Sequence, residues 1–131
     1  MISIAMKKTI FPLILLVCLV FSFVACFHFH DTTISAKDNE GRYRFKAKFE
    51  RRETYRIKQY LQSVLRNEYD AYASRNGNID ADVVLDDNTR FYLYARPGIL
   101  LIDMDKEENS GSSRERVKAI GEDIKSLLSN R

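Results

Sequence analysis

The 131-residue chain has only two cysteines, Cys18 and Cys26, and two histidines, His28 and His30. All four lie within its first 30 residues, and Cys18 is part of an apolar run. Residues 31–131 therefore contain no thiols for a disulfide, no Cys or His ligand for zinc, and no thiol nucleophile. They also lack a histidine that could serve as the base of a nucleophile–base pair. A domain built from them must be stabilised by its core alone.

Recognisable catalytic motifs are also absent. The chain contains no G-x-S-x-G, no glycine-rich phosphate loop, no H-E-x-x-H and no internal repeat. Its formal net charge is only +3, and removal of Lys7 and Lys8 with a leader would leave nineteen basic residues against eighteen acidic ones. A nearly neutral chain has no overall attraction to nucleic acid, so we expect no nucleic-acid partner. We likewise expect no cofactor and no enzymatic activity.

The first part of the chain has the layout of a secretory signal. Lys7 and Lys8 form a positively charged start, and residues 10–23 form an apolar run without a charge. Small Ala25 then directly precedes Cys26. This layout predicts export from the cytoplasm.

The four residues Phe23-Val24-Ala25-Cys26 resemble the cleavage box of bacterial lipoprotein precursors, with Phe23 where that family prefers Leu. The resemblance implies cleavage before Cys26, diacylation of its thiol and acylation of the new amino terminus. Several acyl chains on one residue meet the requirement for stable anchoring. It further implies a membrane-anchored lipoprotein of the bacterial cell envelope. With Phe27 after the cysteine, the resemblance also implies the periplasmic side of an outer membrane, if one is present.

Three other interpretations of the leader stay open. It could be a plain secretory signal that is cleaved elsewhere, or an apolar helix buried in a core. It could also be an uncleaved anchor, because residues 10–29 approach the ~20 apolar residues that a spanning helix needs. Pro12 and the shortness of the run favour a cleaved segment instead.

We divide the chain into a signal peptide at residues 1–25, a lipidated cysteine with a flexible tether at residues 26–41, and a small domain at residues 42–131. The tether is polar after its first residues and shows no period. His28 and His30 would point to one side of an extended chain, but two ligands without a third make a poor metal site.

The domain alternates between strand and helix patterns. Residues 43–49 have a period of two, with Tyr43, Phe45, Ala47 and Phe49 on one face. A helical stripe follows over residues 53–73, then three strands around residues 79–85, 91–95 and 99–104. Ser112-Ser113-Arg114-Glu115 matches a capping box before a last helix, in which Gly121 indicates close approach to the sheet. The order β-α-β-β-β-α predicts an α+β two-layer sandwich, with a four-stranded sheet and two helices on one face.

Two groups of side chains are candidates for a site. Arg44, Lys46 and Lys48 form the polar face of the strand at residues 43–49, which would suit phosphate, lipid headgroups or wall carboxylates. A basic face also simply keeps a sheet soluble. The charge is uneven along the chain, since residues 42–75 hold ten basic residues against four acidic ones.

The second group is acidic and comprises Asp80, Asp82, Asp103 and Asp105. Such carboxylates could serve a small hydrolase or a cation-binding protein, although residues 76–82 lack the glycine and the bidentate glutamate of a calcium loop. We expect a lipid-anchored binding or structural module that contacts an envelope protein or the cell wall. The hydrolase or cation-binding protein is the alternative.

Overall fold

The computed structural model describes residues 32–130. The predicted signal peptide, lipidation at Cys26 and the His28/His30 pair lie outside the described residues.

The fold is built on one sheet of five strands in the order β1-β2-β5-β4-β3. Every pair of neighbouring strands is antiparallel. The strands are β1 (Thr33–Asp38), β2 (Arg42–Lys48), β3 (Ile79–Val84), β4 (Arg90–Arg96) and β5 (Ile99–Asp105). The central strand β5 therefore joins a hairpin of β1 and β2 to a meander of β3 and β4.

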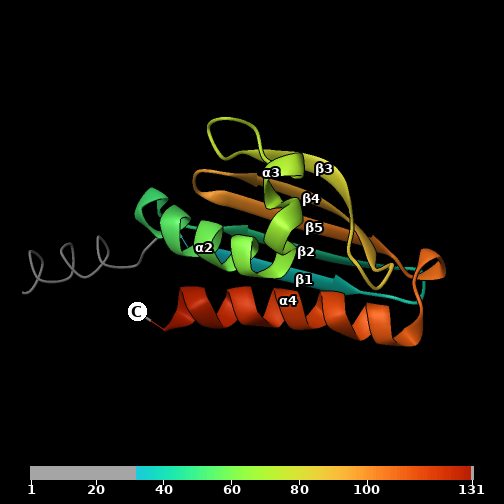
Figure 1. Cartoon of the computed structure of the whole chain (residues 1–131). Helices are drawn as coiled ribbons and strands as arrows, with labels where there is room; N and C mark the ends of the chain where they lie inside the picture. The colour runs from blue at the N-terminus through green and yellow to red at the C-terminus, as the bar shows by residue number, and fades with distance from the viewer. Residues whose placement is uncertain (1–31, 131) are drawn as a thin grey trace, which may run out of the picture. The chain divides into compact units, whose positions relative to one another are not determined.

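One group of helices connects β2 to β3, and a second group comes after β5 in the sequence. The crossover from β2 to β3 comprises η1 (Arg51–Glu53), α2 (Thr54–Leu65), η2 (Arg66–Glu68) and α3 (Tyr69–Tyr72). After β5 come η3 (Lys106–Glu108) and the long helix α4 (Gly111–Ser129). The longer helices α2 and α4 lie on the same face of the sheet (Figure 1).

Alternation along each strand determines what these helices cover. In β2, exposed and buried residues alternate, with Tyr43, Phe45 and Ala47 buried. Ile57 and Leu61 of α2 and Val117 of α4 are buried as well. Burial of these apolar side chains between the two layers provides the main driving force for folding. The core thus lies between the sheet and the helices.

The prediction of a four-stranded sheet is wrong, although the α+β class is compatible with the structure. The additional strand is β1, which lies within residues 26–41, the segment that the sequence predicted to be a tether. β1 pairs with β2 along its whole length, from Thr33 opposite Lys48 to Asp38 opposite Tyr43. Five of its six residues are exposed, so the strand is held mainly by its backbone pairing and shows little apolar alternation.

Two local predictions about the helices also need correction. The helix predicted over residues 53–73 is interrupted at Arg66, whose φ of 52° ends α2. The last helix is capped by Ser110, whose hydroxyl accepts a hydrogen bond from the backbone N–H of Ser113 at 3.2 Å. The capping box predicted at residues 112–115 therefore lies inside α4.

The close approach predicted at Gly121 is confirmed. A Cβ atom at this position would lie 2.3 Å from the hydroxyl oxygen of Tyr43 and 3.3 Å from the ring of Phe45. Only a residue without a side chain leaves room for β2 to pack this closely against α4.

Candidate binding face

Within residues 32–130, one face of the sheet is not covered by the helices, and we call it the open face. Residues directly opposite each other on paired strands share a face, so the register defines its members. They are Thr33, Ser35 and Lys37 of β1, Arg42, Arg44, Lys46 and Lys48 of β2, Ile99, Leu101, Asp103 and Asp105 of β5, Arg90, Tyr92, Tyr94 and Arg96 of β4, and Asp80, Asp82 and Val84 of β3.

Both groups of candidate residues lie on this one face. The basic group projects from β2, whereas the acidic group projects from β5 and β3. Pairing of β2 with β5 places Arg44 opposite Asp103 and Lys46 opposite Leu101. The sequence presented two separate candidate sites, and the fold combines them into a single surface.

On the open face, Asp103 is fixed by two ion pairs. Its carboxylate accepts hydrogen bonds from the guanidinium groups of Arg42 at 2.8 Å and of Arg44 at 2.9 Å. The Asp103 side chain is only 11% exposed, while both arginines are about half exposed. Across residues 32–130, neither Lys46 nor Lys48 forms an ion pair. The two lysines are therefore the unpaired part of the basic group.

Two other acidic residues have local contacts. Asp80 accepts a hydrogen bond of 2.5 Å from the hydroxyl of Tyr92, and this bond raises the pKa of that phenol. Asp105 accepts from the backbone N–H of Glu107 at 3.0 Å and so caps η3. The described residues contain no group of three or more Asp, Glu, His or Cys side chains placed to hold a metal ion. The hydrolase or cation-binding alternative stays a prediction.

The middle of the open face is aromatic and aliphatic. Tyr92, Tyr94, Ile99 and Leu101 lie on the adjacent strands β4 and β5, and each is partly exposed. The guanidinium of Arg96 lies over the ring of Tyr94, 5.1 Å from its centroid, in a cation–π contact. Partly exposed tyrosines flanked by arginines are typical of protein–protein interfaces.

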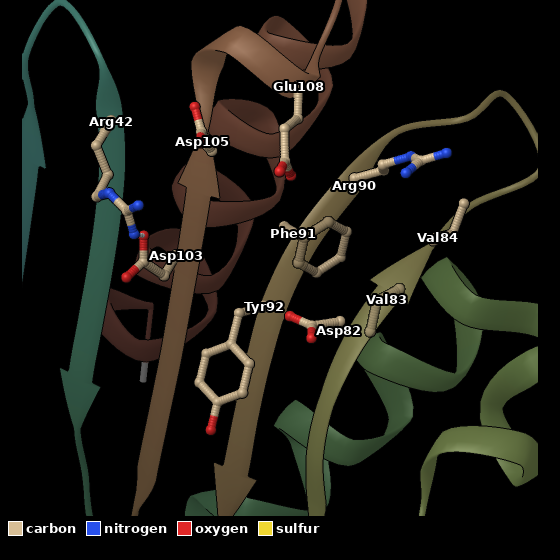
Figure 2. Close-up of a pocket in the computed structure, with 10 residues that line it drawn as sticks. All are labelled: Arg42, Asp82, Val83, Val84, Arg90, Phe91, Tyr92, Asp103, Asp105 and Glu108. Carbon is tan, nitrogen blue, oxygen red and sulfur yellow. Dashed lines mark hydrogen bonds and ion pairs between the residues drawn. The ribbon is translucent and has the colours of Figure 1, made fainter.

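A hollow of about 500 Å³ lies at the end of the open face where β5 leads into η3. At one edge of it Arg42 points toward Asp103, and the carboxylate of Glu108 projects toward it from η3 (Figure 2). Asp82 and Tyr92 complete its floor, whereas the guanidinium of Arg90 points away (Figure 2). The hollow is lined mainly by charged and polar groups of both signs.

Sequence reasoning did not include Arg42, Tyr92 or Tyr94 in a candidate site. The alternation of residues 91–95 puts Tyr92 and Tyr94 on the side of their strand away from Phe91 and Leu93, as in the structure. Alternation carried no information that Leu101 of β5 lies between Tyr94 and Lys46, or that Arg42 pairs with Asp103, because these neighbours come from strands distant in the sequence. Only the sheet order reveals them.

Fold and surface together define a class of protein, an α+β domain with one open antiparallel sheet face. No protein-family model matches the chain, and neither a curated protein nor a solved structure matches it. Among residues 32–130, none of the helices is both long and apolar enough to cross a membrane.

Proposed function

We propose that the protein is a lipid-anchored binding module of the bacterial cell envelope, without enzymatic activity, that binds a partner protein through its open face. The anchor is the cysteine at position 26, on the strength of the resemblance between Phe23-Val24-Ala25-Cys26 and the lipoprotein cleavage box. The domain beyond it supplies the binding surface.

The observation that carries this proposal is the composition of the open face. Two tyrosines and two aliphatic residues occupy its centre, and unpaired lysines border them on β2. Aromatic side chains provide large contact areas at a low cost in conformational entropy, and binding hot spots are enriched in Tyr and Arg. A surface of this kind suits a protein better than a small molecule.

The charges of the open face indicate what kind of partner surface would fit it. Lys46 and Lys48 project beside Leu101 and Ile99, their opposite residues on β5. A partner with an apolar patch bordered by carboxylates would bury the aliphatic centre and pair with both lysines. Complementary charges of this kind mainly raise the association rate and the specificity of a complex.

The test is site-specific photo-crosslinking in the native host. A photoreactive residue at Tyr94 on the open face should produce a crosslink to one discrete envelope protein, and a photoreactive residue at Lys125 on α4 should not. The double variant Lys46→Glu/Lys48→Glu should abolish the crosslink from position 94. An unchanged crosslink would exclude the two lysines from the interface.

The matched control reverses two charges outside the open face. Arg75 lies in the loop before β3 and Lys125 on α4, and both are exposed. Arg75→Glu/Lys125→Glu changes the net charge by the same amount as the test variant, so the crosslink from Tyr94 should persist. Intact mass spectrometry of the membrane-extracted protein, with Cys26→Ala as its control, tests the anchor separately.

A further inference from the structure

In the described domain, basic and acidic side chains are distributed unevenly between the two ends of the strands. At one end, the segment after β2 meets the turn between β4 and β5: the backbone N–H of Phe49 donates to the carbonyl of Gly98 at 2.9 Å. The backbone N–H of Gly98 donates in turn to the hydroxyl of Thr54 at 3.1 Å. We call this the basic end, and its exposed members are Lys48, Arg51, Arg52, Tyr55 and Arg96. Arg52 pairs with Glu50, whereas Lys48, Arg51 and Arg96 form no ion pair within residues 32–130.

The opposite end of the strands is acidic. There the backbone N–H of Lys106 donates to the carbonyl of Gly41 at 3.0 Å, which joins the β1–β2 turn to η3. Exposed carboxylates gather on these segments and on the neighbouring turn between β3 and β4. They belong to Asp38, Glu40, Asp86, Asp87, Glu107 and Glu108. Asp38 pairs with Lys106 and Lys118, and Arg116 pairs with Asp86 and Asp87, so these bases offset part of the negative charge. An anionic surface would therefore attract the basic end more strongly than this one.

Tyr55 gives the basic end a second feature. It is 66% exposed, the highest value among the large hydrophobic side chains of residues 32–130. It lies in the first turn of α2, three residues after Arg52 in the sequence. A tyrosine with its ring accessible beside arginines is the combination found where proteins rest on the headgroup region of a bilayer.

The chain also enters the sheet at the basic end. Thr33, the first residue of β1, lies opposite Lys48, so the chain enters the sheet at the basic end. Thr33 lies only seven positions after Cys26 in the sequence. Since a residue spans at most about 3.5 Å, an acyl anchor on Cys26 keeps this end within about 25 Å of a membrane surface.

We propose that the basic end docks onto anionic lipid headgroups of the membrane that holds the anchor. The inference rests on the proposed anchor at Cys26, but uses a different surface from the partner-binding centre of the open face. Lys48 and Arg96 belong to both the basic end and the open face. In the docked orientation the strands stand on the membrane, the acidic end points away from it, and the open face stays accessible to a protein partner.

The experiment exploits the absence of tryptophan from the chain, which makes any introduced tryptophan a unique fluorophore. The complete mature protein, extracted from host membranes as Tyr55→Trp, is reconstituted into vesicles of phosphatidylcholine with or without phosphatidylglycerol. Only with phosphatidylglycerol should the emission shift to the blue and be quenched by nitroxide-labelled lipids. Raising NaCl to 1 M, where the Debye length falls to about 3 Å, should reverse both changes.

Two controls test whether the contact with the membrane lies at the basic end. Tyr94→Trp places the fluorophore on the open face, and its emission should be the same in both kinds of vesicle. Arg51→Glu/Arg52→Glu in the Tyr55→Trp background should abolish quenching, whereas Lys37→Glu/Arg90→Glu, with the same change in charge on exposed sites away from the basic end, should preserve it. Equal quenching at both positions, or none at position 55, would overturn the proposal.

A separate measurement tests the acyl anchor. Flotation with pure phosphatidylcholine vesicles reports the acyl chains and does not depend on anionic lipid. Protein that floats without quenching of Tyr55→Trp refutes the docked orientation and leaves the anchor intact. Protein that does not float with these vesicles refutes the anchor, and with it the proposal that depends on it.

Discussion

The two faces of the sheet are made by the same five strands and share almost nothing else. On the covered face, Phe45, Leu93, Leu100 and Ile102 are at most 1% exposed. On the open face, their neighbours in the same strands are charged or only partly buried. The side chains of the covered face therefore stabilise the fold, and those of the open face are available for binding. Removing atoms from the covered face leaves cavities, whereas substituting the open face should leave the fold unchanged.

The largest expected effect separates two adjacent leucines of β5. Leu100 faces the helices and is 0% exposed, while Leu101 is partly exposed on the open face. Leu100→Ala should lower the free energy of unfolding by about 3 kcal/mol, because a buried truncation loses transfer energy and leaves a cavity. Leu101→Ala should lower it by less than about 1 kcal/mol. Urea unfolding measures both, and equal losses would mean that a further layer covers the open face.

A second prediction concerns the tightest contact between the covered face and a helix. Gly121→Ala should destabilise the protein by about 2 kcal/mol, because the new methyl group collides with the Tyr43 hydroxyl. This cost outweighs the gain of up to about 1 kcal/mol from replacing glycine inside a helix.

Removing the colliding atom provides the control. Gly121→Ala in a Tyr43→Phe background should recover most of the lost stability, since the next nearest atom is 3.3 Å away, in Phe45. A double-mutant cycle by thermal unfolding measures this coupling. Independent, additive losses would show that the two residues are not in contact.

The covered face was predictable from the sequence because each side chain there follows a local period. Alternation identified Tyr43, Phe45 and Ala47 as one face, and helical spacing puts Val117 and Ile124 on one stripe of the last helix, where both are buried. Strand β1 was not predictable in this way. Its six residues include a single partly buried one, Ile34, because an edge strand can be held by backbone pairing alone.

The interruption at Arg66 was also invisible, because no glycine or proline marks it in the sequence. The open face was predictable only in pieces. Each strand reveals its polar side, but the pairing of Arg44 with Asp103 joins residues 59 positions apart. No local pattern encodes that register. The composite surface follows from the order of all the strands, which depends on tertiary packing.

The third prediction tests how much the charges of the open face add to stability. Asp103→Asn should cost about 1 kcal/mol, because both arginines that it pairs are half exposed and solvent screens such pairs. Asp82→Asn removes an exposed carboxylate of the same face that has no ion pair within residues 32–130, and should be neutral. Urea unfolding at pH 7 checks both. A loss of more than about 3 kcal/mol for Asp103→Asn would place this charge pair in the class of buried ones.

The smallest expected effect lies at the rim between the faces, and it depends on pH. Asp87 accepts hydrogen bonds from Thr89, including its backbone N–H at 3.1 Å, and pairs with Arg116 of α4 at 2.7 Å. The contact with Thr89 comes first and that with Arg116 second in lowering the pKa of Asp87 to about 2, against about 3.9 in an unfolded chain. A lowered pKa stabilises the folded state above about pH 4, and this contribution disappears as the pH falls through 2. Asp87→Asn should therefore cost about 0.5 kcal/mol at pH 7, the size typical of an exposed pair. Its unfolding curve should converge with that of the unmodified protein near pH 2, and a difference that persists at pH 2 would mean that Asp87 stabilises the rim by its shape rather than its charge.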